Sequence, residues 1–456
     1  MKRFFWLGWT LFLCGVWCGC GDTFRPIIIP NPPVFPNPKA AHTAVSINDN
    51  GTVMPGTAMV IDVSGDTDVS EATVGLAPIH AVQQTANTVL VANHSATGKA
   101  ADSLVKLTFF GTVIAAPTTI SLPADSAPNF VAVAPTDTTA YVTLPNFVPP
   151  SVGVVNTQSD NLVATIPVGN NPVAIAVTTD KSKLYVANQG SNSVSGFNTL
   201  DRSSRTISGS FNAPLWLVSR SDSQRVYVLN GNGVVSTIDT TSTAGPDDVI
   251  DASVTVPGAA YMLYDGNLNR LYIPGGSQLT ILDISRSTPV VMTGGPIAIP
   301  TVAPGSRLVS DPCSLTSAQP LTVAAVAALP DASRAYVGAF YLDASDNICP
   351  QVTVIDVASN TIKSSIAVPG FPNATNPNSL YFAPVCATTR FRFTMAAGGD
   401  SSRAYLASCD GGMVNIIDTS TDTYILNKSA PVGTRPPIPP SLLNPPQNPV
   451  FLFAGP

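Results

Sequence analysis

Charged side chains are scarce in this chain of 456 residues, because Asp, Glu, Lys and Arg together make up only 11% of it. Apart from the adjacent Lys2 and Arg3, the 22 Lys and Arg residues are scattered singly along the sequence. A surface that follows nucleic-acid phosphates needs clustered basic residues, so we expect no nucleic-acid partner. Hydrophobic residues reach 45%, which indicates a large core, and 42 Pro with 33 Gly disfavour long helices.

Motifs for catalysis and cofactor binding are also missing. The sequence has no H-E-x-x-H, no G-x-S-x-G, no D-x-D-x-D-G calcium loop and no C-x-x-C-H haem motif. It has no C-x-x-C pair either, which removes the usual redox dithiol and zinc-ribbon interpretations. From the sequence we therefore assign no catalytic residue, no metal site and no cofactor.

The one apolar run near the N-terminus is too short to span a bilayer comfortably. It covers residues 4–16, follows two basic residues and ends in small ones, which predicts a secretory signal peptide over residues 1–20. Its end resembles a bacterial lipoprotein signal, with Cys20 as the predicted lipid attachment site. Trp17 stands where an aliphatic residue is usual, so cleavage without a lipid and attachment at Cys18 are the alternatives.

A proline-rich stretch follows this signal. Proline at the density of residues 21–41 favours an extended chain that cannot join a sheet, so we expect a tether there and a folded body over residues 42–456. Together these segments predict an exported lipoprotein of the cell envelope. The lipid anchor would hold it to a membrane, with the body on the periplasmic or cell-surface side.

Only four cysteines lie beyond the N-terminal segment: Cys313, Cys349, Cys386 and Cys409. An even number in an exported chain favours disulfides, and four cysteines allow three connectivities. Pairing between sequence neighbours would join Cys313 to Cys349 and Cys386 to Cys409.

A repeat organises the rest of the chain. Residues 173–177, 183–187 and 193–197 predict three short strands separated by turn residues, and residues 162–168 predict a strand before them. The tyrosines of similar second strands, Tyr141, Tyr185, Tyr227 and Tyr272, follow one another at intervals of 44, 42 and 45 residues. Four short strands per unit at this period predict an all-β fold, a single β-propeller of four-stranded blades.

The two ends of the repeat predict how the ring closes. Residues 43–47, 58–63 and 72–75 look like second, third and fourth strands that lack a first strand. Residues 448–453 repeat the first-strand pattern and then the chain stops. We therefore expect the C-terminal strand to complete the N-terminal blade, which favours eight blades; seven is the alternative if residues 43–47 are not a strand.

The third predicted strand of seven repeats ends in Asp or Asn, in four of them as V-x-D or I-x-D: Val60-Ile-Asp62, Ile281-Leu-Asp283, Val354-Ile-Asp356 and Ile416-Ile-Asp418. The other three end at Asn156, Asn198 and Asp239. Asp or Asn at a strand exit can accept backbone N–H bonds in a turn, so we interpret these side chains as structural. The LYVAN strand, the preceding NPVAIAV and this motif resemble the YVTN-repeat β-propellers of bacterial and archaeal exported and surface proteins. The resemblance covers roughly residues 42–453 and implies a binding, surface or scaffold module.

Candidate ligand-binding residues are few. His80 falls on a predicted first strand that lines the channel, and His94 follows the second strand of the same blade, so paired imidazoles could hold a metal there. The alternative is a hydrogen-bonded channel residue for His80 and a surface turn for His94. Trp216 is the one tryptophan beyond the N-terminal segment and would either pack between blades or offer a stacking platform to a ligand.

These observations leave three classes of function open. We favour a non-catalytic envelope module that binds a protein, a peptide or a glycan, with insertions at residues 300–319 and 341–349 at the contact face. A lactonase-like or other propeller hydrolase is the competing class, and it requires a metal or carboxylates at the channel mouth. A self-associating surface layer is the third.

Overall fold

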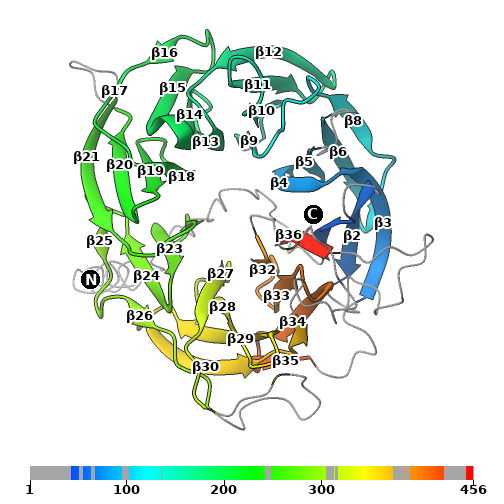
Figure 1. Ribbon diagram of the computed structural model, residues 1–456, viewed down its shortest axis with the longest axis vertical. Coiled ribbons are helices and arrows are strands. Elements are labelled where there is room, and N and C mark those ends of the chain that lie inside the picture. The colour runs from blue at the N-terminus through cyan, green and yellow to red at the C-terminus, as the bar shows by residue number, and fades with distance from the viewer. Residues whose placement is uncertain are drawn as a thin grey trace, which may run out of the picture. The chain divides into compact units, whose positions relative to one another are not determined.

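In the computed structural model, eight sheets, antiparallel apart from one short parallel pair, stand around a common centre, as the blades of a β-propeller do (Figure 1). The structure describes residues 43–50, 55–62, 67–94, 102–134, 136–241, 248–303, 313, 317–372, 386, 391–425 and 448–454. All of them belong to one unit that runs from Asn31 to Pro456. The predicted signal peptide (residues 1–20), the tether (residues 21–41), Cys18 and Cys20 lie outside the described residues.

Each blade contributes one strand to each of four positions, which we number outward from the centre of the ring. The first strands of blades one to eight are β36 (Asn448–Ala454), β4 (Pro78–Thr85), β9 (Val131–Val133), β13 (Pro172–Val177), β18 (Pro214–Ser219), β22 (Leu263–Asp265), β27 (Thr322–Ala328) and β32 (Phe393–Ala397). The second strands are β1 (Thr43–Asp49), β5 (Thr88–Asn93), β10 (Thr139–Leu144), β14 (Lys183–Asn188), β19 (Arg225–Asn230), β23 (Arg270–Gly275), β28 (Arg334–Leu342) and β33 (Arg403–Ser408).

The third strands are β2 (Pro55–Asp62), β6 (Ser103–Phe110), β11 (Ser151–Asn156), β15 (Ser193–Asn198), β20 (Val234–Asp239), β24 (Gln278–Asp283), β29 (Asn347–Asp356) and β34 (Met413–Asp418). The outer strands are β3 (Thr67–Leu76), β8 (Thr118–Ser121), β12 (Asn161–Pro167), β16 (Ser204–Arg205), β21 (Asp248–Thr255), β25 (Val290–Val291) with β26 (Ile297–Ala298), β30 (Thr361–Ala367) and β35 (Thr423–Tyr424). Short additions are β7 (Val113–Ile114), β17 (Ile207–Ser208), β31 (Phe371–Pro372) and the 3₁₀ turn η1 (Gln189–Ser191).

Burial explains why the second strands gave the clearest sequence signal. Five of the six residues of β14 are buried, since a strand on each side and a blade on each face cover it. The outer strand β12 instead alternates between exposed and more buried residues along most of its length. A strand covered on both faces has a nearly continuous apolar sequence, whereas a half-covered strand alternates.

The chain closes its ring as the sequence predicts. β36 pairs with β1, with Phe451 opposite Ile47 and Phe453 opposite Val45, while β1 pairs with β2 on its other side. Figure 1 shows this last strand inside the first blade, next to strands from the opposite end of the chain. The favoured prediction of eight blades is therefore confirmed.

Two disulfides fix the enlarged repeats of blades seven and eight. Cys313 is bonded to Cys349 of β29, and Cys386 is bonded to Cys409 just after β33. This is the pairing of sequence neighbours. The insertion expected at residues 341–349 is mostly strand rather than loop, because β28 extends to Leu342 and β29 begins at Asn347.

The residues that end the third strands act as turn acceptors. Asp239 accepts the N–H of Thr241, Asp418 accepts that of Ser420, and Asn156 accepts those of Gln158 and Ser159. These are the structural turns that the sequence predicts.

Cationic side chains tie neighbouring blades together directly after these turns. At five seams, a Lys or Arg of one blade donates to the carbonyl of the residue that follows the turn acceptor in the next blade. Donor and acceptor are Lys106 and Thr157, Lys183 and Thr240, Arg220 and Ile284, Arg270 and Val357, and Arg334 and Thr419. We call these contacts the blade latches.

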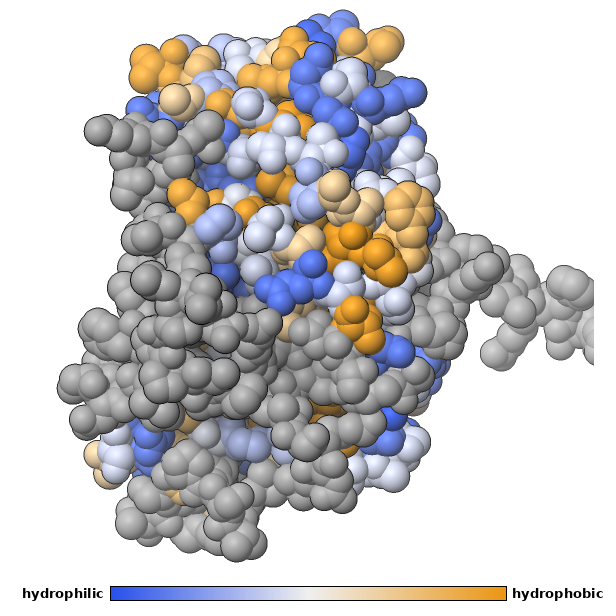
Figure 2. Space-filling model, turned by 90° about the vertical axis from the view of Figure 1, so that its right-hand side faces the viewer, coloured by the Kyte–Doolittle hydropathy of each residue, from blue (hydrophilic) through white to orange (hydrophobic). Residues whose placement is uncertain are grey.

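The outer surface is mixed in character. Figure 2 shows hydrophobic residues interspersed with hydrophilic ones on the side that it presents. The described part of the chain contains no helix that is long and apolar enough to cross a membrane.

Candidate functional site

One register position on the first strands gathers aromatic side chains at the centre of the ring. His80 lies opposite Ala92, Trp216 opposite Leu229 and Phe451 opposite Ile47. Phe130 precedes β9 and its carbonyl accepts the N–H of Thr143. Tyr261 lies two residues before Leu263, the first residue of β22. These five residues and Phe391, which precedes β32, are called the aromatic tier.

The rings of the tier form a closed circuit of contacts. His80 stacks on Phe130 with 3.9 Å between ring centroids, and Phe130 meets Trp216 edge-on at 5.4 Å. Trp216 contacts Phe391 at 5.8 Å, Phe391 contacts Phe451 at 6.1 Å, and Phe451 returns to His80 at 5.0 Å. Tyr261 joins the circuit through Trp216 and Phe391. Residues from five blades and from the segment before β32 therefore meet at the centre.

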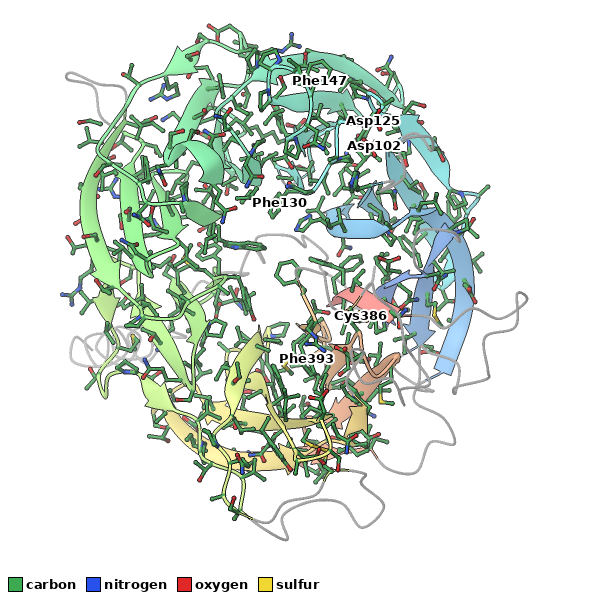
Figure 3. The ribbon with its side chains drawn as sticks, in the orientation of Figure 1. Asp102, Asp125, Phe130, Phe147, Cys386 and Phe393 are labelled. Carbon is green, nitrogen blue, oxygen red and sulfur yellow. A yellow bond between two sulfur atoms is a disulfide. The ribbon has the colours of Figure 1, made fainter. Side chains whose placement is uncertain are left out.

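Small residues at the same register position make room for these contacts. In blades four, seven and eight this position holds Ala174, Ala325 and Thr394. Because Ala174 lies between them in ring order, Phe130 of blade three and Trp216 of blade five can touch each other. In Figure 3, Phe130 and Phe393, the first residue of β32, lie on opposite sides of the centre of the ring.

Two residues of the tier are buried and the other four are only partly buried. Phe130 is 5% exposed and His80 6% exposed, whereas Trp216, Tyr261, Phe391 and Phe451 are only partly buried. Edge-to-face and stacked aromatic pairs each contribute about 0.5–1.5 kcal/mol beyond the area that they bury. The closed circuit therefore holds the four accessible rings in fixed positions.

His80 acts as a hydrogen-bond acceptor within this tier. Its Nδ1 accepts the N–H of Val131 at 3.3 Å, an arrangement that places the ring proton on Nε2. Burial raises the pKa of Tyr261 well above its usual value, so its phenol stays protonated at neutral pH. The tier is thus an apolar stacking surface with few polar groups.

His94, the second predicted imidazole, has a different environment. Its Nδ1 lies 3.2 Å from Oδ1 of the buried Asp102, whose other oxygen accepts from Ser126 and from the N–H of Ala127. The structure therefore gives His80 and His94 separate partners, an aromatic stack for one and a carboxylate for the other.

Metal-ligating groups converge at one place in the described part of the chain. That place is Cys313, Asp343 and Cys349, and its two sulfurs are already joined in a disulfide. A disulfide sulfur is not the thiolate that binds a metal, so this cluster is structural.

Sequence reasoning found Trp216 and His80 but missed Phe130, Phe391 and Tyr261 as members of one site. A signal was present for part of the set, since Pro128-Asn-Phe130 and Pro214-Leu-Trp216 share the same spacing from a proline. The equal spacing from proline indicates that Phe130 and Trp216 occupy the same position on their strands. Only the arrangement of the blades in the structure shows that the two rings are in contact.

Solved structures with the same architecture support the fold. AztD from Citrobacter koseri matches with a TM-score of 0.55 at 12% identity, covering 90% of this chain and 97% of its own. The dihydro-heme d1 dehydrogenase NirN, solved in complex with DHE, matches at 0.56 and 10% identity, covering 85% and 72%. A protein of unknown function from Desulfotomaculum acetoxidans DSM 771 matches at 0.50 and 13% identity, covering 71% and 95%. No protein-family model and no curated sequence matches this chain.

Proposed function

We propose that this protein is a non-catalytic binding module of the cell envelope, and that the aromatic tier receives the ligand. The observation that carries the proposal is the exposure of Trp216, Tyr261, Phe391 and Phe451, which stay partly open although they lie among the inner strands. Rigid aromatic rings bury a large contact area at little cost in conformational entropy. They suit the apolar face of a sugar ring or the apolar side chains of a peptide.

The position of the site supports this interpretation. Ligand sites in proteins are typically concave, apolar and largely preformed, with a few polar groups that set orientation. The inner strands of eight blades hold the tier, so its rings come from a rigid scaffold rather than from loops.

The location at the envelope rests on the N-terminal sequence. The proposed route is export through the signal peptide at residues 1–20, lipid attachment at Cys20, and a proline-rich tether over residues 21–41 that separates the body from the membrane. Two disulfides agree with an oxidising compartment. The intact mass of protein extracted from membranes tests the lipid directly.

A binding screen tests the proposal. Full-length protein would be applied to a glycan array and to a peptide library, alongside the Trp216→Ala and Phe391→Ala variants. We expect at least a tenfold loss of affinity in both variants for any ligand selected by the wild type. The control is Phe110→Ala, since Phe110 is 70% exposed at the end of a third strand, away from the tier.

The outcome that contradicts the proposal is equally concrete. Ligands that bind the two tier variants as tightly as the wild type would place the binding surface elsewhere. A stoichiometric divalent ion in the purified protein, lost in His80→Ala together with turnover of a lactone or ester, would instead establish the hydrolase.

A further inference from the structure

Three of the eight seams have no blade latch among the described residues, and the seam between blades three and four is one of them. The position that supplies the latch in three other blades is the first residue of the second strand, where Lys183, Arg270 and Arg334 pair with the residue that ends the third strand. In blade three the same register position, opposite Asn156, holds Thr139. Among the described residues, no side chain donates to the Thr199 carbonyl, which is the corresponding acceptor in blade four.

The acceptor side of this seam is also changed. Four residues after the turn acceptor, blades three, seven and eight carry Asp160, Asn360 and Asp422, each with a positive φ of 53–55°. Each of the three accepts from its latch cation. Blade four has Arg202 at this position, with the same backbone conformation at φ 61°. Compared with the latched seams, this seam has Thr139 of blade three in place of the latch cation. It has Arg202 of blade four in place of the Asp or Asn that accepts from that cation.

A pocket of about 670 Å³ occupies this seam. Thr139, Tyr141 and Val163 line it from blade three, and Thr199, Leu200 and Arg202 line it from blade four. Leu200 is 98% exposed and Val163 49% exposed, so apolar side chains border the opening. The volume lies within the range of about 300–1,000 Å³ that is usual for small-molecule sites.

Two acidic and two basic side chains line the pocket, and the acidic ones already accept hydrogen bonds from the protein whereas the basic ones make few contacts. Asp137 accepts the N–H groups of Thr138 and Thr139, and Asp201 accepts the N–H and hydroxyl of Ser203. Both acids are thus engaged in their own turns. In the part of the chain that the structure describes, the Arg202 side chain has no hydrogen bond or ion pair. Lys181 also lines the pocket and makes one long contact, 3.4 Å to the Thr136 carbonyl.

We propose that this seam pocket binds a small organic anion, a carboxylate carried on an apolar body, with Arg202 and Lys181 at the charged end and Val163 and Leu200 beside the apolar end. An arginine fork matches a carboxylate in two parallel hydrogen bonds. A cationic ligand would face two positive side chains whose neighbouring acids are already hydrogen-bonded. The site is separate from the aromatic tier and does not depend on the function proposed for it.

The experiment uses full-length protein and ligand-detected NMR saturation transfer with benzoate and hexanoate. Benzamide and hexanamide serve as neutral probes of the same size. Thr139→Lys combined with Arg202→Asp places a cation and an acid at the positions that Arg334 and Asp422 hold between blades seven and eight, and should restore the latch and fill the pocket. Arg202→Ala removes the main anion contact, and Arg286→Ala removes an exposed arginine after the corresponding turn of blade six as the control.

We expect transfer to both carboxylates but not to the amides. We also expect at least fivefold weaker binding in Arg202→Ala, no binding in the latch variant and wild-type binding in Arg286→Ala. The latch variant should melt at or above the wild-type temperature, which also shows that it is folded. Absence of binding by either carboxylate to the wild type, equal binding of acid and amide, or unchanged binding in Arg202→Ala would each overturn the proposal.

Discussion

The buried tyrosines of the second strands show how single residues join the blades. Tyr336 is fully buried, and its hydroxyl donates to Asp422 of the next blade at 2.6 Å. Arg334 and Lys363 contact the same carboxylate. Burial opposes ionisation of Asp422, yet the hydrogen bonds from Lys363 and Tyr336 outweigh it and hold the pKa of Asp422 below its usual value. Tyr336 is therefore both a core residue and a donor across the seam, and Tyr185 makes the same kind of bond to Asp248 of the next blade.

Substitution of Tyr336 by Phe should lower the free energy of unfolding by about 1.5–3 kcal/mol, because a hydrogen bond to a charged acceptor is lost without a change in packing. Urea unfolding followed by circular dichroism measures the difference. Tyr424→Phe is the matched control, since Tyr424 is partly buried and makes no hydroxyl hydrogen bond to any described residue. Equal losses in both variants would contradict this role of the hydroxyl.

At the scale of the element, the turn after each third strand recurs with the same chemistry. A backbone hydrogen bond from Ser359 lowers the pKa of Asp356, and a side-chain hydrogen bond from Ser420 lowers that of Asp418. For Asp239 and Asp283, partial burial opposes the shift, but hydrogen bonds from Thr241 and Ser285 outweigh it. These carboxylates stabilise the fold only while they are ionised.

The sign of the pH dependence follows directly. Because their pKa values are lower in the folded chain than the unfolded value of 3.8, the folded chain binds fewer protons than the unfolded chain. This stabilisation is complete above pH 3.8 and is lost as the pH falls through the folded pKa values. We expect the melting temperature to fall as the pH is lowered from 5 to 2.5. This fall in melting temperature should be smaller in the double variant Asp356→Asn/Asp418→Asn. An equal fall in the variant and the wild type would show that these two carboxylates do not stabilise the fold through their turns.

The two disulfides stabilise the enlarged repeats of blades seven and eight. The bond between Cys313 and Cys349 spans 36 residues, and a loop of that length predicts a stabilisation of about 4 kcal/mol from restriction of the unfolded chain. The variant with both cysteines changed to Ala should therefore melt at a clearly lower temperature in a calorimetric scan. Since Cys349 is fully buried, dithiothreitol at neutral pH should not produce the same loss without partial unfolding. A double variant as stable as the wild type would show that the bond does not hold this repeat.

The elements could be predicted from the sequence because each repeat buries its second strand in the same way. Tyr185, Tyr227 and Tyr272 follow one another at similar intervals, 42 and 45 residues, for that reason. The blade latches could not be predicted, because Lys183 reaches Thr240 across 57 residues of sequence. Nor does the sequence show that Arg202 replaces an acid unless the turns of several blades are first superimposed.

At the scale of the molecule, stability depends on the closure between the two ends of the chain. Asn448 donates its side-chain N–H to the Asp49 carbonyl, and Val450, Leu452 and Phe453 are buried. Without β36, β1 would be an open edge, and an unpaired edge is prone to aggregation.

Phe453→Ala should lower the free energy of unfolding by about 3–5 kcal/mol, the usual result of removing a buried phenylalanine side chain. Phe453 is 6% exposed, while Phe110, the matched control for the same substitution, is 70% exposed. Chemical denaturation of both variants gives the comparison. A Phe453→Ala protein no less stable than the Phe110→Ala protein would show that the last strand does not close the ring.

The candidate site was less predictable than the fold for a physical reason. His80, Trp216 and Phe451 are separated by more than one hundred residues from one another in sequence, and only closure of the ring brings their rings together. Phe391 lies outside the regular first strand of its blade, so no repeat pattern marks it.

The emission of Trp216 tests the central claim most directly, because this side chain belongs to the tier. Acrylamide quenching would be compared between the full-length protein and Trp216→Phe, so that the difference reports on this one residue. The account predicts that Trp216 is quenched in the free protein and becomes protected when a ligand selected in the binding screen is added. Quenching of Trp216 that the bound ligand leaves unchanged would contradict the assignment of the aromatic tier as the binding surface.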